Sequence, residues 1–117
     1  MPKEEHEFFH PEEVAWEPVT GGSGAAAEGM VEKILSFDEA TGVCTRLLKF
    51  ALGVETSEVL VHDFWEEVII LEGDLHDKTL NKTFTSGMYA CRPPGMRHGP
   101  YAAPRGCMTF EVRYYKK

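Results

Sequence analysis

Two histidines and one glutamate stand at spacings that would suit one metal site: His62, Glu66 and His98. Imidazole nitrogens and carboxylate oxygens bind divalent transition metals, and a set of two histidines and one carboxylate leaves coordination positions open. We therefore predict a divalent metal ion at these residues, with iron as the first choice and zinc or manganese as alternatives. The competing hypothesis is a barrel without metal, in which the three groups only form hydrogen bonds.

The elements that must position these residues follow the pattern of a β protein. Short runs rich in Val, Ile, Leu, Phe, Tyr and Thr alternate with turns that contain Gly, Pro, Asn and Asp. No long helical periodicity is present, so we expect an all-β fold, a small antiparallel barrel or jelly roll. The expected strands span residues 31–36, 43–50, 57–62, 66–72, 74–78, 82–85, 88–92 and 107–115.

The expected connections and domain bounds complete this prediction. Turns are predicted at 38–42, at 78–81 and at Gly73-Asp74, where two strands would form a hairpin. Residues 1–30 are predicted to be an irregular lead-in that Trp16 docks on the main body, and residues 31–117 a single barrel domain.

The motif spacing resembles that of a known family. His62-x3-Glu66-x6-Gly73, followed by Gly87-x5-Pro93-x-Gly95-x2-His98, is similar to the two motifs of the cupins. The second motif matches through His98, although Ala102 stands where an asparagine is usual. The first motif departs at Leu60, where the family has the first histidine of His-x-His. The resemblance covers residues 43–115.

Within the cupins, four segments resemble ChrR-type cupin domains, their small stand-alone relatives and acetylacetone-cleaving dioxygenases: residues 45–50, 66–67, 71–73 and 92–95. The resemblance implies a jelly-roll barrel and a metal held by up to three histidines and one glutamate. Of these, His62, Glu66 and His98 can be carried over. It favours a metal-dependent, dioxygenase-type enzyme that acts on a small oxygenated organic molecule. The alternatives are a non-catalytic ligand-sensing or metal-sensing module and a metal-free barrel.

Further side chains are candidates for the wall of the cavity. Leu60 shares the face of His62, and the others are Trp65, Tyr89, Cys91 and Tyr101. Arg46 and Arg92 could hold a substrate carboxylate or enolate, or could instead form salt bridges with nearby acids. Glu67 cannot share the face of Glu66 and is expected at the surface.

Composition limits the partners. The formal net charge is −7 without a basic stripe, which argues against nucleic acid and against an anionic membrane surface. Three cysteines without metal-finger spacing fit a reducing cytoplasm. Both faces of the strand that leads to His62 are partly apolar, because Val59 and Val61 flank Leu60. We therefore expect the outer face to be covered, by the N-terminal segment or by a second copy in a homodimer.

Overall fold

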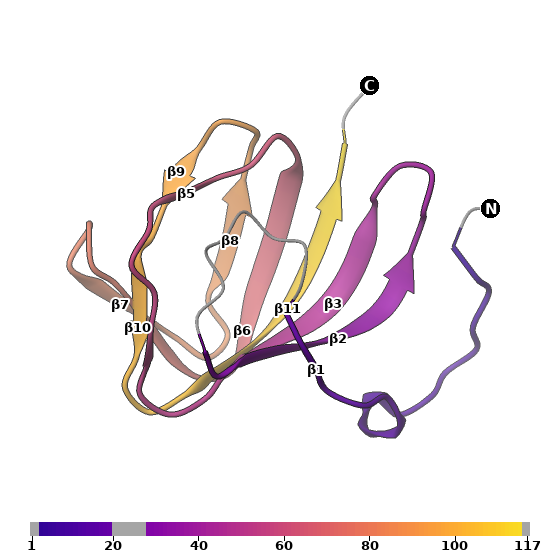
Figure 1. Ribbon diagram of the computed structural model, residues 1–117, viewed down its shortest axis with the longest axis horizontal. Coiled ribbons are helices and arrows are strands. Elements are labelled where there is room, and N and C mark those ends of the chain that lie inside the picture. Colours follow the sequence, from indigo (N-terminus) through magenta and orange to yellow (C-terminus); the bar gives the residue numbers. More distant parts are fainter. Residues whose placement is uncertain (1–2, 20–27, 116–117) are drawn as a thin grey trace.

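An antiparallel sheet curls into a half-barrel, and its inner face holds the core (Figure 1). This computed structural model describes residues 3–19 and 28–115. Within those residues there is no α-helix, and the one helical turn is the 3-10 helix η1 (Pro11–Glu13). The prediction of an all-β antiparallel fold is confirmed. The strands are β1 (Glu17–Pro18), β2 (Met30–Phe37), β3 (Cys44–Phe50), β4 (Val54–Glu55), β5 (Leu60–Val61), β6 (Trp65–Asp77), β7 (Lys82–Thr85), β8 (Tyr89–Arg92), β9 (Arg97–His98), β10 (Tyr101–Ala103) and β11 (Cys107–Tyr114).

The long strand β6 organises the sheet. The order of the larger sheet is β1-β2-β3-β11-β6-β10-β4, and β7 and β8 also pair with β6. Strands β5 and β9 form a separate two-stranded sheet. Because β6 pairs with β11 and β8 near its start and with β7 and β10 near its end, it passes from one side of the half-barrel to the other.

The hairpin predicted at Gly73-Asp74 was wrong. β6 continues through both residues, and the register of β11 against it shifts between Met108 and Thr109. Gly73 has a φ of +76°, and a Cβ there would lie 2.1 Å from the carbonyl oxygen of Gly106. The register shift leaves Leu71 unpaired, and the glycine two residues on lets β6 approach the backbone at Gly106, where the sequence pattern indicated a reversal of the chain.

Shorter segments also differ from the prediction. The strand expected at 57–62 is reduced to β5, and β4 precedes it. Strands β9 and β10 were not predicted, because they are short and are interrupted by Gly99-Pro100. The turn at 38–42 is confirmed, with the Gly42 amide donating to the Asp38 carbonyl at 2.8 Å. The turn at 78–81 is also confirmed between β6 and β7.

The N-terminal segment lies along the outside of β2 and β3. The Trp16 ring lies under the ammonium groups of Lys33 and Lys49, 4.6 and 5.4 Å from its centroid. Lys33 also donates to the Pro11 carbonyl at 2.9 Å, so the predicted docking by Trp16 is confirmed.

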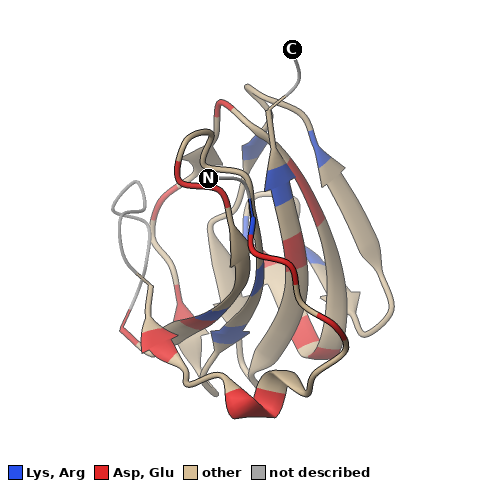
Figure 2. Cartoon of the chain, turned by 90° about the vertical axis from the view of Figure 1, so that its right-hand side faces the viewer, with Lys and Arg blue, Asp and Glu red and all other residues tan. Residues whose placement is uncertain are grey.

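Residues 1, 2 and 20–27 of the predicted lead-in, and 116–117 of the predicted barrel domain, lie outside the described residues. In Figure 2 the coiled turn of η1 is red because it carries Glu12 and Glu13. No helix in the described ranges has the length and apolar character needed to cross a bilayer.

Candidate metal centre and cavity

The three predicted ligands come together from separate segments. His62 follows β5, Glu66 is the second residue of β6, and His98 ends β9. One ligand atom from each lies within 4.8 Å of the other two. The structure thus brings together the two parts of the motif, which are more than thirty residues apart in the sequence.

Local pairing explains how His98 reaches His62. Strand β8 ends at Arg92, and the Met96 amide donates to the Pro93 carbonyl at 3.1 Å, which closes the turn. The Gly95 amide then donates to the His62 carbonyl at 2.9 Å. Beyond the turn, His98 pairs with Leu60 across β5 and β9. The Pro-Pro-Gly turn therefore fixes His98 beside the strand that carries His62.

His98 presents one unpaired nitrogen at this site. Its Nδ1 lies 2.7 Å from the Tyr101 hydroxyl, which holds the ring in place. Its Nε2 is buried and has no hydrogen-bond partner within the described chain. An unpaired buried nitrogen is costly, and it is the group that a metal ion would satisfy. Burial, together with Arg92 and His62, lowers the pKa of His98 to about 3, so the ring is neutral, as a metal ligand must be.

The ring of His62 is held at the mouth of the site. It stacks on Phe64 with centroids 4.5 Å apart and lies 5.1 Å from the ring of His98. Its pKa is lowered by burial and by the nearby charges of Arg113 and Arg92. Both imidazoles of the site therefore favour the form that binds metal.

Glu66 and Glu67 point to opposite faces of β6. Glu66 is buried inside, where its Oε1 accepts from Arg92 Nη1 at 2.9 Å. Burial and the neighbouring Glu111 raise the pKa of Glu66. Glu67 accepts hydrogen bonds from the hydroxyls of Tyr89 and Tyr114 on the outer face. The carboxylate that faces His62 and His98 is thus Glu66.

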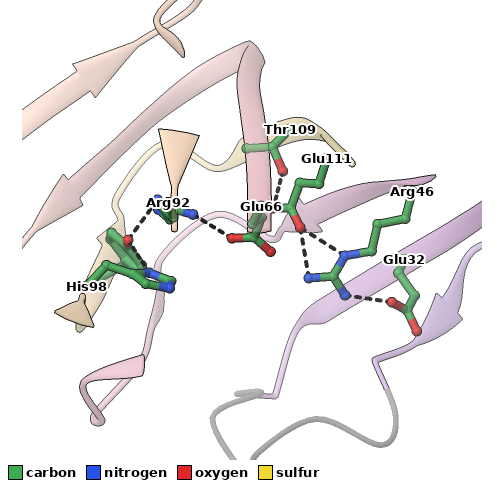
Figure 3. A network of polar contacts seen from close by, with 8 residues as sticks. Glu32, Arg46, Glu66, Arg92, His98, Thr109 and Glu111 are labelled. Carbon is green, nitrogen blue, oxygen red and sulfur yellow. Dashed lines mark hydrogen bonds and ion pairs between the residues drawn. The ribbon is translucent and has the colours of Figure 1, made fainter. Parts of the chain in front are cut away.

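The buried charges of the half-barrel form two hydrogen-bonded groups, one at the metal site and one around Glu111 (Figure 3). Arg46 donates to Glu111 at 2.9 Å and to Glu32 at 2.7 Å. Arg92 bonds both Glu66 and, at 2.8 Å, the Tyr101 hydroxyl. Of the two roles considered for these arginines, the structure shows the salt bridges. These contacts use only part of each guanidinium's five N–H donors, so the role of either arginine in binding a substrate carboxylate or enolate stays a prediction.

A cavity of about 990 Å³ opens beside these groups. Its wall includes the predicted residues Leu60, Arg46, Arg92 and Tyr101. Tyr89 also lines the cavity, although its hydroxyl donates to Glu67 on the outer face. Two other candidates lie elsewhere: Trp65 stacks on Tyr114, and Cys91 is exposed on β8. These two differ from the expectation because they occupy the outward positions of their strands.

Sequence reasoning missed the acids that complete the network. Glu111 and Thr109 are buried on β11, where the Thr109 hydroxyl donates to Glu111 at 2.9 Å. Glu32 is buried on β2. The alternation of Thr109, Glu111 and Arg113 on one face of a strand was the available signal. This signal is weak, because polar residues on one face of a strand usually indicate solvent exposure.

Comparison with known proteins identifies the kind of domain. The family model of the ChrR cupin-like domain matches residues 4–115. No curated protein matches the sequence.

Solved structures share the fold. An RmlC-like cupin from Shewanella frigidimarina is 24% identical with a TM-score of 0.73, over 100% of this chain and 96% of that one. An acetylacetone dioxygenase from Acinetobacter johnsonii is 15% identical with a TM-score of 0.72, over 95% and 74% of the two chains. The polyketide cyclase RemF from Streptomyces resistomycificus is 18% identical with a TM-score of 0.73, over 96% and 81%.

Proposed function

Because the chain belongs to the ChrR cupin-like domain family, we propose that it is a small metal-dependent cupin enzyme of the dioxygenase type. It acts on a small oxygenated organic molecule. His62, Glu66 and His98 hold a divalent ion, with iron as the first choice and zinc or manganese as alternatives. The observation that carries the proposal is the buried, unpaired Nε2 of His98, grouped with ligand atoms of His62 and Glu66 within 4.8 Å.

Leu60 gives this site its open character. It lies opposite His98 in the β5–β9 pair and lines the cavity, at the motif position where cupins have another histidine. An aliphatic side chain cannot coordinate, so three protein ligands remain where four would close a site. The vacated position faces the cavity, where a substrate can approach.

The neighbouring residues support this chemistry. A bound ion supplies Lewis-acid polarisation or oxygen activation. Tyr101 fixes the ring of His98, and Arg92 holds Oε1 of Glu66, so that both groups are oriented from behind. The apolar part of the cavity wall excludes water from the reacting molecule.

One observation favours the alternative of a metal-free barrel. A buried carboxylate needs a cation, and Arg92 already supplies one to Glu66 at 2.9 Å. Glu66 can therefore remain buried without a metal. This salt bridge does not satisfy Nε2 of His98, which is why the metal site remains the leading proposal.

Elemental analysis of protein purified without added metal tests the proposal, using His98→Ala and the matched control His76→Ala. His76 lies away from the site, with its Nδ1 3.0 Å from the Thr83 hydroxyl. The proposal expects about one iron, manganese or zinc per chain in the parent and in His76→Ala, and none in His98→Ala. No metal in the parent, even after reconstitution, would reject it.

Chelation separates the three functions. An enzyme loses turnover with EDTA while its fold persists. A sensing module shows no turnover and changes shape or oligomeric state when its ligand or metal binds. A metal-free barrel keeps the same melting temperature with and without EDTA.

The proposal also includes a cytoplasmic homodimer with no nucleic-acid or membrane partner. Val59, just before β5, is 40% exposed, and Val61 in β5 is 47% exposed although it also borders the cavity. The N-terminal segment packs on β2 and β3 and leaves these valines exposed, which favours a second copy as their cover. Sedimentation velocity tests this, with a monomer as the contradicting result.

A further inference from the structure

The cavity has two chemically different ends. One end holds the metal-site residues and the buried charges that reach Glu111. The other end is apolar, and its walls come from strands on both sides of the half-barrel: Leu48, Phe50, Ile70, Leu75, Phe84 and Met88. Four of these, Leu48, Phe50, Ile70 and Leu75, also belong to the main hydrophobic cluster. The core of the protein and the apolar end of the cavity are therefore one surface.

The alternation along single strands produces this division. On β3 the inward residues change from Arg46 to Leu48 and Phe50. On β6 they change from Glu66 to Val68 and Ile70. Each strand thus contributes a charged residue near the metal site and apolar residues farther along the same face.

The size of the cavity sets what can fill it. Its volume of about 990 Å³ lies at the top of the range of about 300–1,000 Å³ that encloses drug-sized ligands. A molecule of a few carbon atoms at the metal site would leave the apolar end without a partner. Apolar walls hold water poorly, so an apolar group is the occupant that they favour.

We propose that the ligand of this site is an amphiphile. An anionic oxygen head, a carboxylate or an enolate, lies at the metal site, and an extended alkyl or aromatic body lies along the apolar end. This inference rests on the proposed function for the head and on the cavity alone for the body. The two parts can therefore fail separately.

Straight-chain carboxylates are the probes that measure the apolar contribution. Butanoate, hexanoate, octanoate and decanoate are titrated by calorimetry into the metal-loaded full chain and into the EDTA-treated chain. Each added methylene is expected to tighten Kd by about fourfold, the factor that corresponds to about 0.8 kcal/mol per buried methylene. An affinity that does not change with chain length in either form overturns the proposal for the body.

The metal tests the head independently. Decanoate should bind more tightly to the metal-loaded form than to the EDTA-treated form, and decylamine should not show this gain. Equal binding of decylamine and decanoate to the loaded form overturns the anionic head. A chain that takes up no metal rejects the proposed function, and the chain-length series in that form still decides the body.

A matched pair of variants locates the body. Ala90 lines the cavity on β8, and the next residue, Cys91, is exposed on the outer face. Ala90→Phe adds a ring inside the cavity, and Cys91→Phe adds the same ring outside. We expect Ala90→Phe to weaken the binding of decanoate at least tenfold, while the affinity for butanoate and the metal content stay unchanged. Cys91→Phe should leave both affinities and the metal content unchanged. Unchanged decanoate binding in folded Ala90→Phe overturns the placement.

A milder pair serves if Ala90→Phe does not fold. Ile70 lines the cavity, whereas its neighbour Ile69 is 36% exposed on the other face of β6. Ile70→Thr should weaken the binding of decanoate severalfold and leave the affinity for butanoate unchanged. Ile69→Thr should change neither affinity. Equal effects of the two substitutions on decanoate overturn the placement.

Discussion

The two faces of β6 shift the pKa values of two neighbouring glutamates in opposite directions. On the inner face, burial and Glu111 raise the pKa of Glu66. On the outer face, hydrogen bonds from Tyr89 and Tyr114 lower the pKa of Glu67. The inner environment therefore shifts Glu66 toward its neutral form, against the opposing effect of Arg92, and the outer one shifts Glu67 toward its charged form.

This difference shows where the fold accommodates buried charge. The inner face carries Glu32, Glu66 and Glu111 with Arg46 and Arg92 as partners, all shielded from water. A charged network of this kind is weak evidence for stability, because desolvation offsets its attraction. It is better evidence for a functional site, because buried ionisable groups with shifted pKa values tend to gather around the cavities where ligands bind. The predictions below compare the two faces directly.

The largest expected effect is on stability when an inner acid is neutralised. Glu111→Gln leaves the buried guanidinium of Arg46 with Glu32 as its remaining ionic partner. Breaking a buried pair costs about 3–5 kcal/mol, and the retained Glu32 contact places this variant near the lower end. Denaturant unfolding of the metal-free protein measures the change.

Glu67→Gln is the matched control on the outer face. In the glutamine the amide oxygen still accepts from one tyrosine hydroxyl, and the amide nitrogen can donate to the oxygen of the other. On this exposed face the free energy of unfolding should change only slightly, as expected for surface contacts. If both variants were equally stable, the network would not hold Arg46 as described.

The next effect is on metal affinity, and it uses the neighbouring pair. Glu66→Gln should weaken metal binding by at least about 10–100-fold, the loss typical even of groups that only support a ligand. Glu67→Gln should bind metal like the parent. Competition with a chelator of known affinity gives both dissociation constants. Equal losses in the two variants would place the metal elsewhere.

The last comparison concerns how the stability of the metal-free protein depends on pH. The pKa of His98 is about 3 in the folded chain and near 6.5 in an unfolded chain. Between these two values the unfolded state therefore binds more protons than the folded state. The contribution of His98 to the free energy of unfolding is complete above about pH 6.5 and declines as the pH falls toward 3. Glu66 contributes the opposite slope, because its pKa is raised.

The difference between the parent and His98→Gln isolates the histidine. The melting temperature of the parent should fall more steeply than that of the variant as the pH decreases from 6.5 to 4. Parallel curves would mean that His98 is not held in its neutral form by burial.

The sequence predicted the all-β class, the docking of Trp16 and the grouping of His62, Glu66 and His98, because these rest on strand alternation, on an aromatic anchor and on motif spacing. It did not predict the continuous β6, since a glycine within a strand that approaches a neighbouring backbone and a glycine at a hairpin turn look alike in sequence. It also did not predict that Arg46 and Arg92 are engaged by Glu111, Glu32 and Glu66. Those contacts depend on which strands become neighbours, and the sequence pattern left that open.

The central claim is one divalent ion held by His62, Glu66 and His98, and anomalous diffraction at the absorption edge of the metal tests it most directly. Crystals of the metal-loaded protein should show one anomalous peak per chain, about 2.0–2.2 Å from a nitrogen of each histidine and from an oxygen of Glu66. A peak whose ligands are other residues would contradict the account. So would the absence of a peak after metal loading, with Arg92 still paired to Glu66 and Nε2 of His98 bonded to water.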